Sequence, residues 1–122
     1  MRRVDAVTGI ITTIAGTGVL GYAGDGGPAI LAELAFPYSV AVAPDGTIYI
    51  TDYDNNAIRK IVKSGIITTI TTIAGTGAIL PNGGLASISL IKFPYGICVA
   101  PNGDVFCSDS VFNLIDRLYL GA

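Results

Sequence analysis

The sequence predicts an all-β fold assembled from repeated units, and three observations support that expectation. The first is internal repetition, because residues 11–18 (ITTIAGTG) recur unchanged as residues 70–77. The second is a two-residue alternation of apolar side chains along short runs rich in β-branched and aromatic residues, which is the period of strands. The third is the supply of turn residues, since the 122 residues include 16 glycines and 6 prolines.

A longer repeat defines the unit. Residues 36–61 recur as residues 93–118, with 10 of the 26 positions identical. We therefore expect about two repeats of 57 residues, in a chain that begins partway through a unit. The end of a preceding unit is expected in residues 1–18, a complete unit in residues 36–77 and an incomplete one in residues 93–118.

Each unit has the pattern of a four-stranded antiparallel meander. In the complete unit the strands are expected at residues 38–43, 47–52, 57–62 and 66–73. Both faces of such a sheet carry apolar residues, so both have to be covered, as happens when copies of the sheet stack side by side. The sequence therefore predicts about two four-stranded antiparallel blades of a β-propeller. Residues 29–34, apolar apart from Glu33, allow one short helical turn.

The two hairpin loops repeat one turn chemistry. Proline presets φ at the second position of a type I turn, Asp or Asn suits the third, and glycine accepts the left-handed conformation that follows. The residues are Pro44, Asp45 and Gly46 in one unit and Pro101, Asn102 and Gly103 in the next.

Two further turn residues recur, because Asp52 and Asn56 reappear as Asp109 and Asn113. We expect their side chains to stabilise a turn by hydrogen bonds to backbone groups. The spacing around Asp52 also imitates the start of an EF-hand calcium loop, but Ala57 replaces the glycine required at its sixth position. No metal site is expected.

These residues carry a resemblance to a known repeat. Residues 36–42 (FPYSVAV), 48–52 (IYITD) and 58–61 (IRKI) resemble the NHL-repeat signature, and residues 14–18 with 24–29 resemble the long-loop form of that repeat. The resemblance covers nearly all of both copies. It implies a propeller that is typically six-bladed and that serves as a scaffold for protein partners, and sometimes for RNA.

Composition narrows the function classes. The chain has no histidine, which excludes histidine-based triads and histidine metal sites within it. Residues 16–21 (GTGVLG) match the dinucleotide fingerprint formally, but the glycines and proline of residues 24–28 would break the helix that this motif requires. We expect no cofactor. Because no run of 18 apolar residues exists, we expect no membrane span either.

Basic residues concentrate in the third strand of each unit and the turn after it. Arg3, Lys60 and Arg117 occupy equivalent positions and form an expected basic surface row. Such a row suits phosphate binding, or it keeps outer strands soluble and unpaired. The net charge of −2 argues against nucleic acid as a partner.

The two cysteines are expected on adjacent strands of the last hairpin. The three-residue loop places Cys98 opposite Phe106 and Cys107 opposite Ile97, so the two thiols point to opposite faces. We expect no disulfide and a role for both as small apolar core residues.

The leading functional expectation is a non-catalytic scaffold for protein–protein interaction, as a fragment of a longer propeller. The alternatives are a metal-dependent lactonase-like propeller enzyme and an RNA-binding propeller surface. Glu33 is the one glutamate, and no carboxylate cluster recurs at strand starts, which disfavours the enzyme.

The strand order suggests how copies assemble. Nine strands are expected, with the last blade lacking its outermost strand. Partners are then further blades or other copies of the chain, including a homotrimer closing a six-bladed ring. In that ring residues 10–15 of one subunit would lie beside residues 113–118 of its neighbour, and the surplus strand at residues 2–4 would be displaced.

Overall fold

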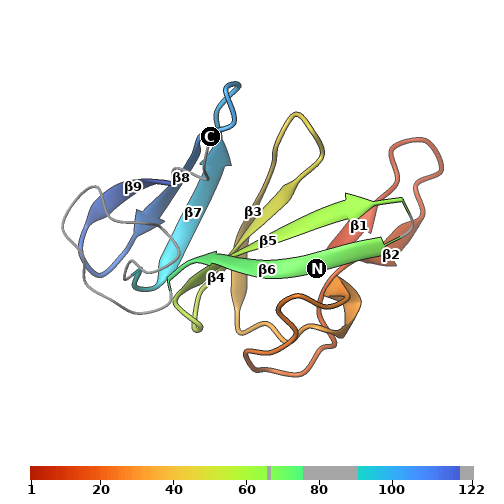
Figure 1. Cartoon of the computed structure of the whole chain (residues 1–122), viewed down its shortest axis with the longest axis horizontal. Helices are drawn as coiled ribbons and strands as arrows, with labels where there is room; N and C mark the ends of the chain where they lie inside the picture. The colour runs from red at the N-terminus through yellow and green to blue at the C-terminus, as the bar shows by residue number, and fades with distance from the viewer. Residues whose placement is uncertain (66, 76–90, 119–122) are drawn as a thin grey trace.

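The computed structural model describes residues 1–65, 67–75 and 91–118. Nine strands within these residues form three antiparallel sheets, which confirms the all-β fold expected from the sequence. The four-stranded sheet lies between the two-stranded and the three-stranded sheets (Figure 1). They are successive blades of a β-propeller. The expected unit boundary at residue 77 and the expected strand start at residue 66 lie outside the described residues.

The complete blade is a meander in chain order. Its strands are β3 (Pro37–Val42), β4 (Ile48–Asp52), β5 (Ala57–Ser64) and β6 (Ile67–Ala74). The strand β5 runs two residues beyond its expected end at Val62 because Lys63 and Ser64 pair with Thr68 and Ile67. A duplicated Thr-Thr-Ile in residues 68–73 supplies the length that these extra pairs require.

The third sheet repeats the first three strands of that blade. It contains β7 (Pro94–Val99), β8 (Val105–Asp109) and β9 (Leu114–Leu118). The pair Ile97–Cys107 reproduces Val40–Ile50, and the same register shift follows the first residue of β3 and of β7. The repeated sequence therefore produces a repeated register.

The first sheet is the outer half of a preceding blade. Its strands are β1 (Arg2–Val4) and β2 (Ile11–Thr13). Val4 pairs with Ile11, as Ile61 pairs with Ile70 in the complete blade. Residues 2–4 and 11–13 thus occupy the places of the third and fourth strands.

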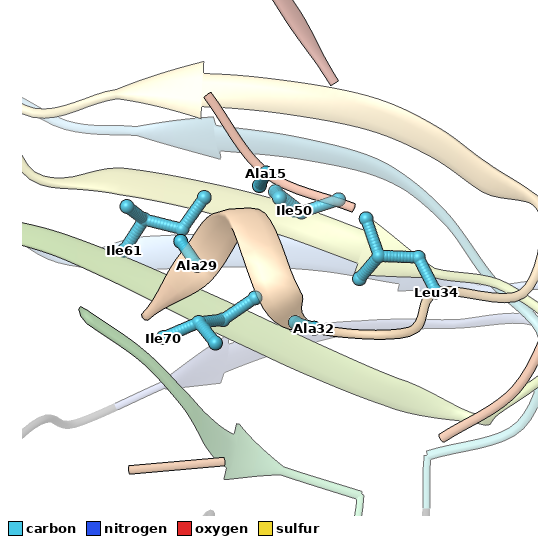
Figure 2. Packing of buried hydrophobic residues seen from close by; sticks show 7 residues of the cluster. All are labelled: Ala15, Ala29, Ala32, Leu34, Ile50, Ile61 and Ile70. Carbon is cyan, nitrogen blue, oxygen red and sulfur yellow. The ribbon is translucent and has the colours of Figure 1, made fainter. Parts of the chain in front are cut away.

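One hydrophobic core lies between the complete blade and the long segment that precedes it. The short 3-10 helix η1 (Ala29–Leu31), where the sequence allows one helical turn, packs against β6 (Figure 2). Small side chains bring this helix close to the sheet, and larger ones from β4, β5 and β6 fill the space around it. The core residues are Ala15, Ala29, Ala32, Leu34, Ile50, Ile61 and Ile70.

A second core joins the complete blade to the third sheet. It comprises Tyr49, Ile58, Ala74, Ile91, Val105, Cys107 and Leu118. The two cores cover both faces of the central sheet, as its apolar faces require. Cys107 lies in this core and pairs with Ile97, as expected, but Cys98 is exposed. The expectation of a core role for Cys98 is wrong, because its face of the third sheet is covered by no other described segment.

No helix among the described residues is long and apolar enough to cross a membrane.

Candidate functional site: the blade interface and its open faces

The hairpin turns carry the predicted residues in matching geometry. Gly46 and Gly103 adopt φ of 88° and 91°, and their N–H groups donate to Ala43 and Ala100 over 2.9 Å. The Asp45 carboxylate accepts the Thr47 N–H over 2.9 Å, and this bond lowers the pKa of Asp45. Pro44 directly precedes Asp45, and Pro101 directly precedes Asn102. In the second turn the Asn102 side chain accepts the Asp104 N–H over 3.1 Å. The turns hold the inner strands of each blade in register.

Asp52 and Asp109 anchor the chain that enters their own blades. Oδ1 of Asp52 accepts the Ala35 N–H over 2.7 Å, and Oδ2 of Asp109 accepts the Lys92 N–H over 2.9 Å. Asp109 also accepts N–H groups of Val111 and Phe112 in the following turn, over 3.0 and 2.8 Å. Both carboxylates are buried. They act as backbone anchors at equivalent places.

Sequence reasoning missed the buried role of Arg59, which precedes Lys60 in the basic third strand and was assigned no site. Its side chain is fully buried and donates from Nη1 to Asp52 over 2.9 Å and from Nη2 to Asp25 over 3.0 Å. It also donates to the carbonyl oxygens of Glu33 and Ala23. This network fastens the long loop of residues 19–33 onto the blade.

The third sheet replaces this cation by a carboxylate. Asp116 stands where Arg59 stands, and burial followed by the nearby Asp109 charge raises its pKa. The pKa of the Cys107 thiol is raised to about 12, by burial first and then by Asp116 and Asp109. No group of three potential metal-ligating side chains occurs in the described part of the chain.

Two side chains of the complete blade bind backbone groups of the third sheet. Oδ1 of Asn56 accepts the N–H of Phe93 over 2.9 Å. The hydroxyl of Thr51 accepts the Ser39 N–H within its own blade and donates to the carbonyl oxygen of Tyr95 over 3.1 Å. The complete blade therefore binds the start of β7 and the residue before it through their backbone groups.

Aromatic rings close the same junction. Tyr53 stacks on Phe93 with ring centroids 4.9 Å apart. The rings of Tyr38 and Tyr95, at equivalent positions of β3 and β7, lie 3.9 Å apart, and the Tyr95 hydroxyl donates to that of Tyr38 over 2.6 Å. That hydrogen bond is the main reason that the pKa of Tyr95 is raised.

The three residues of the expected basic row occupy equivalent strand positions. Two of them form ion pairs with carboxylates, and the third is flanked by neighbouring strands. Arg3 pairs with Asp5 and Arg117 with Asp104, both over 3.1 Å. Lys60 is half-buried between β4 and β6. Two of the three cations are thus already matched by carboxylates.

The faces at the two ends of the blade pair are open. Ile58 is fully buried against the third sheet, whereas Ile115, its equivalent in the third sheet, is 73% exposed. On the opposite side, Val42 of β3 is 62% exposed, while its equivalent Val99 packs against the second core. The third sheet therefore presents the face that is sealed at the internal junction. On the opposite side only β3 is open, because Ile50 and Ile61 of the same face already lie in the first core.

Comparisons with known proteins agree with the repeat. The model of the family described as the Teneurin NHL domain matches residues 15–92. The Arabidopsis thaliana protein SUPPRESSOR OF QUENCHING 1, chloroplastic, is 33% identical over 82 residues, covering 67% of this chain and 8% of that protein. Teneurin-1 of Mus musculus is 49% identical over 43 residues, covering 35% of this chain and 2% of that protein. The chain thus spans less than a tenth of either relative.

Solved structures share the fold. An auxiliary nutrient binding protein from Bacteroides thetaiotaomicron matches with a TM-score of 0.66 and 22% identity, over 95% of this chain and 31% of that one. A second protein of the same organism matches with a TM-score of 0.69 and 22% identity, over 91% of this chain and 28% of that one. Because the repeat signature, the repeated register and the family match agree, the chain belongs to the Teneurin NHL domain family.

Proposed function

We propose that this chain is a non-catalytic propeller segment that binds protein surfaces through the open faces of its blades. The contrast between Ile58 and Ile115 carries the proposal, because one sheet face is sealed by a neighbouring blade in the first copy and 73% exposed at this residue in the second. Clustered apolar surface of this kind is typical of protein-binding sites.

The turn before β9 adds to that surface. Asp54 and Asn55 of the first copy are replaced by Val111 and Phe112, which are 45% and 44% exposed. An exposed turn that exchanges polar for apolar side chains loses favourable hydration, and burial against a partner offsets that loss. The exchange favours a surface that is covered by another protein.

The enzyme and RNA alternatives have less support. Asp52 and Asp109 are saturated by backbone N–H groups and, for Asp52, by the Arg59 guanidinium, so neither is poised to hold a metal ion. Arg3 and Arg117 are paired with carboxylates, which weakens their attraction for phosphates.

Light scattering of the 122-residue chain over a wide concentration range tests the proposal. We expect the average mass to rise with concentration and the binding of a hydrophobic dye to fall in parallel. A monodisperse monomer at all concentrations would contradict the proposal. So would metal-dependent lactone hydrolysis, and so would salt-dependent RNA binding that Lys60→Glu abolishes.

A further inference from the structure

We infer that two copies of this chain dock head to tail, with the open face of β7–β9 in one copy seated on the open face of β3 in the next. This inference rests on the proposed function and names the partner as a second copy. The contact repeats the one that already joins the two blades within a single chain. The two complementary surfaces lie at opposite ends of the same molecule, and at the β3 end the open part comprises Val40 and Val42, since Ile50 and Ile61 are covered by the first core.

We call the open face of β7–β9 the head surface and the open face of β3 the tail surface. The head surface has the polar groups of the internal junction. Asn113 stands at the place of Asn56 and has nearly the same backbone conformation, with φ of 57° against 51°. Ser108 stands at the place of Thr51, and its hydroxyl accepts the Gly96 N–H over 2.9 Å as that of Thr51 accepts the Ser39 N–H over 2.8 Å. The Ser108 hydroxyl can therefore donate to a backbone carbonyl oxygen of a docked copy, as the Thr51 hydroxyl donates to that of Tyr95.

The head surface also has the apolar groups. Ile115 replaces Ile58, and Phe106 replaces Tyr49, both of which lie in the core of the internal junction. Cys98 is exposed on the same face, because its neighbours Ile97 and Val99 along β7 point into that core. A docked blade would cover all three side chains.

The tail surface presents the groups that the head would bind. Phe36 adopts φ of 51°, like the 46° of Phe93, whose N–H group is held by Asn56. This left-handed conformation is rare for a phenylalanine. Because the conformation recurs at the start of both blades, the Phe36 N–H has the same orientation relative to its blade as the Phe93 N–H. Val40 and Val42 beside it are more than half exposed, whereas the equivalent Ile97 and Val99 pack between the blades.

The outer strands fit the same register. Leu118 is equivalent to Ile61, which pairs with Ile70, and Ile70 is equivalent to Ile11 of β2. A docked β9 would therefore pair with β2 of the next copy and complete a four-stranded blade. Strand β1 now occupies that place with three exposed paired residues, and Met1 before it packs against the first core and donates its terminal amine to the Ala15 carbonyl oxygen over 2.6 Å. Docking therefore has to displace Met1 together with β1. The contact is heterologous, because each copy uses a different surface.

One replacement weakens the docked contact relative to the internal one. Tyr53, whose ring stacks on Phe93 across the internal junction, is replaced by Ser110 in the third sheet. The head surface thus lacks the aromatic ring that Tyr53 supplies at the internal junction. Restoring the ring with Ser110→Tyr should tighten association, and adding Ile115→Asp to the same chain should cancel that gain, whereas aggregation of a misfolded chain would persist.

Sedimentation equilibrium of variants blocked at one end tests the inference. Ile115→Asp blocks the head and Val42→Asp blocks the tail, and we expect each alone to weaken association by more than about tenfold. The matched control is Val62→Asp, at a residue 37% exposed near the end of β5 and outside both faces, which should associate like the unaltered chain. An equimolar mixture of the two blocked variants should form a heterodimer, because each keeps one intact surface.

Two variants of Asn113 distinguish its proposed hydrogen bond to the docked copy from non-specific association. Asn113→Gly tolerates positive φ but removes the acceptor and should weaken association, whereas Asn113→Asp keeps the acceptor and should weaken it less. Ser110→Tyr should strengthen it. Association that survives either Ile115→Asp or Val42→Asp, or blocked variants that do not pair when mixed, would overturn the head-to-tail contact alone. A chain that stays monomeric without any substitution would overturn the proposed function as well.

Discussion

Arg59 and Asp52 form an enclosed ion pair, with Nη1 of the guanidinium 2.9 Å from Oδ2 of the carboxylate and both side chains fully buried. Asn55 donates to the same oxygen over 2.8 Å, and Oδ1 accepts the Ala35 N–H. Arg59 reaches Asp25, 34 residues earlier, at the exposed end of the network. The pair therefore links the blade to the loop that covers its first core.

Removing the cation from this pair should be among the most damaging single changes. Arg59→Ala leaves the buried Asp52 carboxylate without its charge partner, and we expect a loss of about 3–5 kcal/mol in the free energy of unfolding. The control is Arg3→Ala, which breaks an exposed pair with Asp5 and should cost about 1 kcal/mol or less. Urea titration of both variants measures the difference, and equal losses would show that the buried pair adds no special stability.

Two glycines with the same backbone conformation should tolerate alanine differently. Gly24 and Gly46 have φ of 95° and 88°, so alanine is strained at both. A Cβ on Gly24 would lie 2.7 Å from Cα of Ala32, whereas a Cβ on Gly46 meets nothing within 4 Å. We expect Gly24→Ala to cost about 1–3 kcal/mol more than Gly46→Ala in thermal unfolding. The reverse order would mean that the loop of residues 19–33 yields without cost.

Asp116 should make the third sheet less stable at neutral pH than in acid. Its pKa is raised above the ordinary value of 3.8, so the folded chain holds the proton more tightly than the unfolded chain. Stability from this group is present below the unfolded pKa and declines as pH rises through the folded pKa. Asp116→Asn should therefore raise the melting temperature near pH 7 and leave it almost unchanged near pH 3.

Asp45 supplies the control of opposite sign. Its pKa is lowered by the Thr47 N–H, so its contribution is present above the unfolded pKa and is lost as pH falls through the folded pKa. Asp45→Ala, which removes the acceptor that asparagine would keep, should lower the melting temperature near pH 7 and lower it less in acid. If both variants shift in the same direction at pH 7, general charge effects rather than these local contacts govern the response.

The repeat made the fold predictable, because equal segments such as residues 36–61 and 93–118 have to build equal strands in equal registers. The Arg59 network was not predictable from strand patterns, since an arginine in a β-run is usually read as solvent-facing. A signal was nevertheless present. Where Asp116 replaces Arg59, Asn82 replaces Asp25, so two distant positions change together. The exposure of Cys98 escaped prediction because it depends on which blades are present, not on the strand itself.

The two thiols should report both the blade core and the docked state. Cys98 is exposed, while Cys107 is buried and has its pKa raised to about 12, so at pH 8 only a small fraction of Cys107 is thiolate. Iodoacetamide should therefore modify Cys98 rapidly and Cys107 slowly in dilute protein. Raising the protein concentration should slow the Cys98 reaction alone, because docking covers its face. The Ile115→Asp variant should lose that concentration dependence. A Cys98 rate that does not change with concentration in the unaltered chain would place the contact elsewhere, and a fast Cys107 would show that the core between the blades opens.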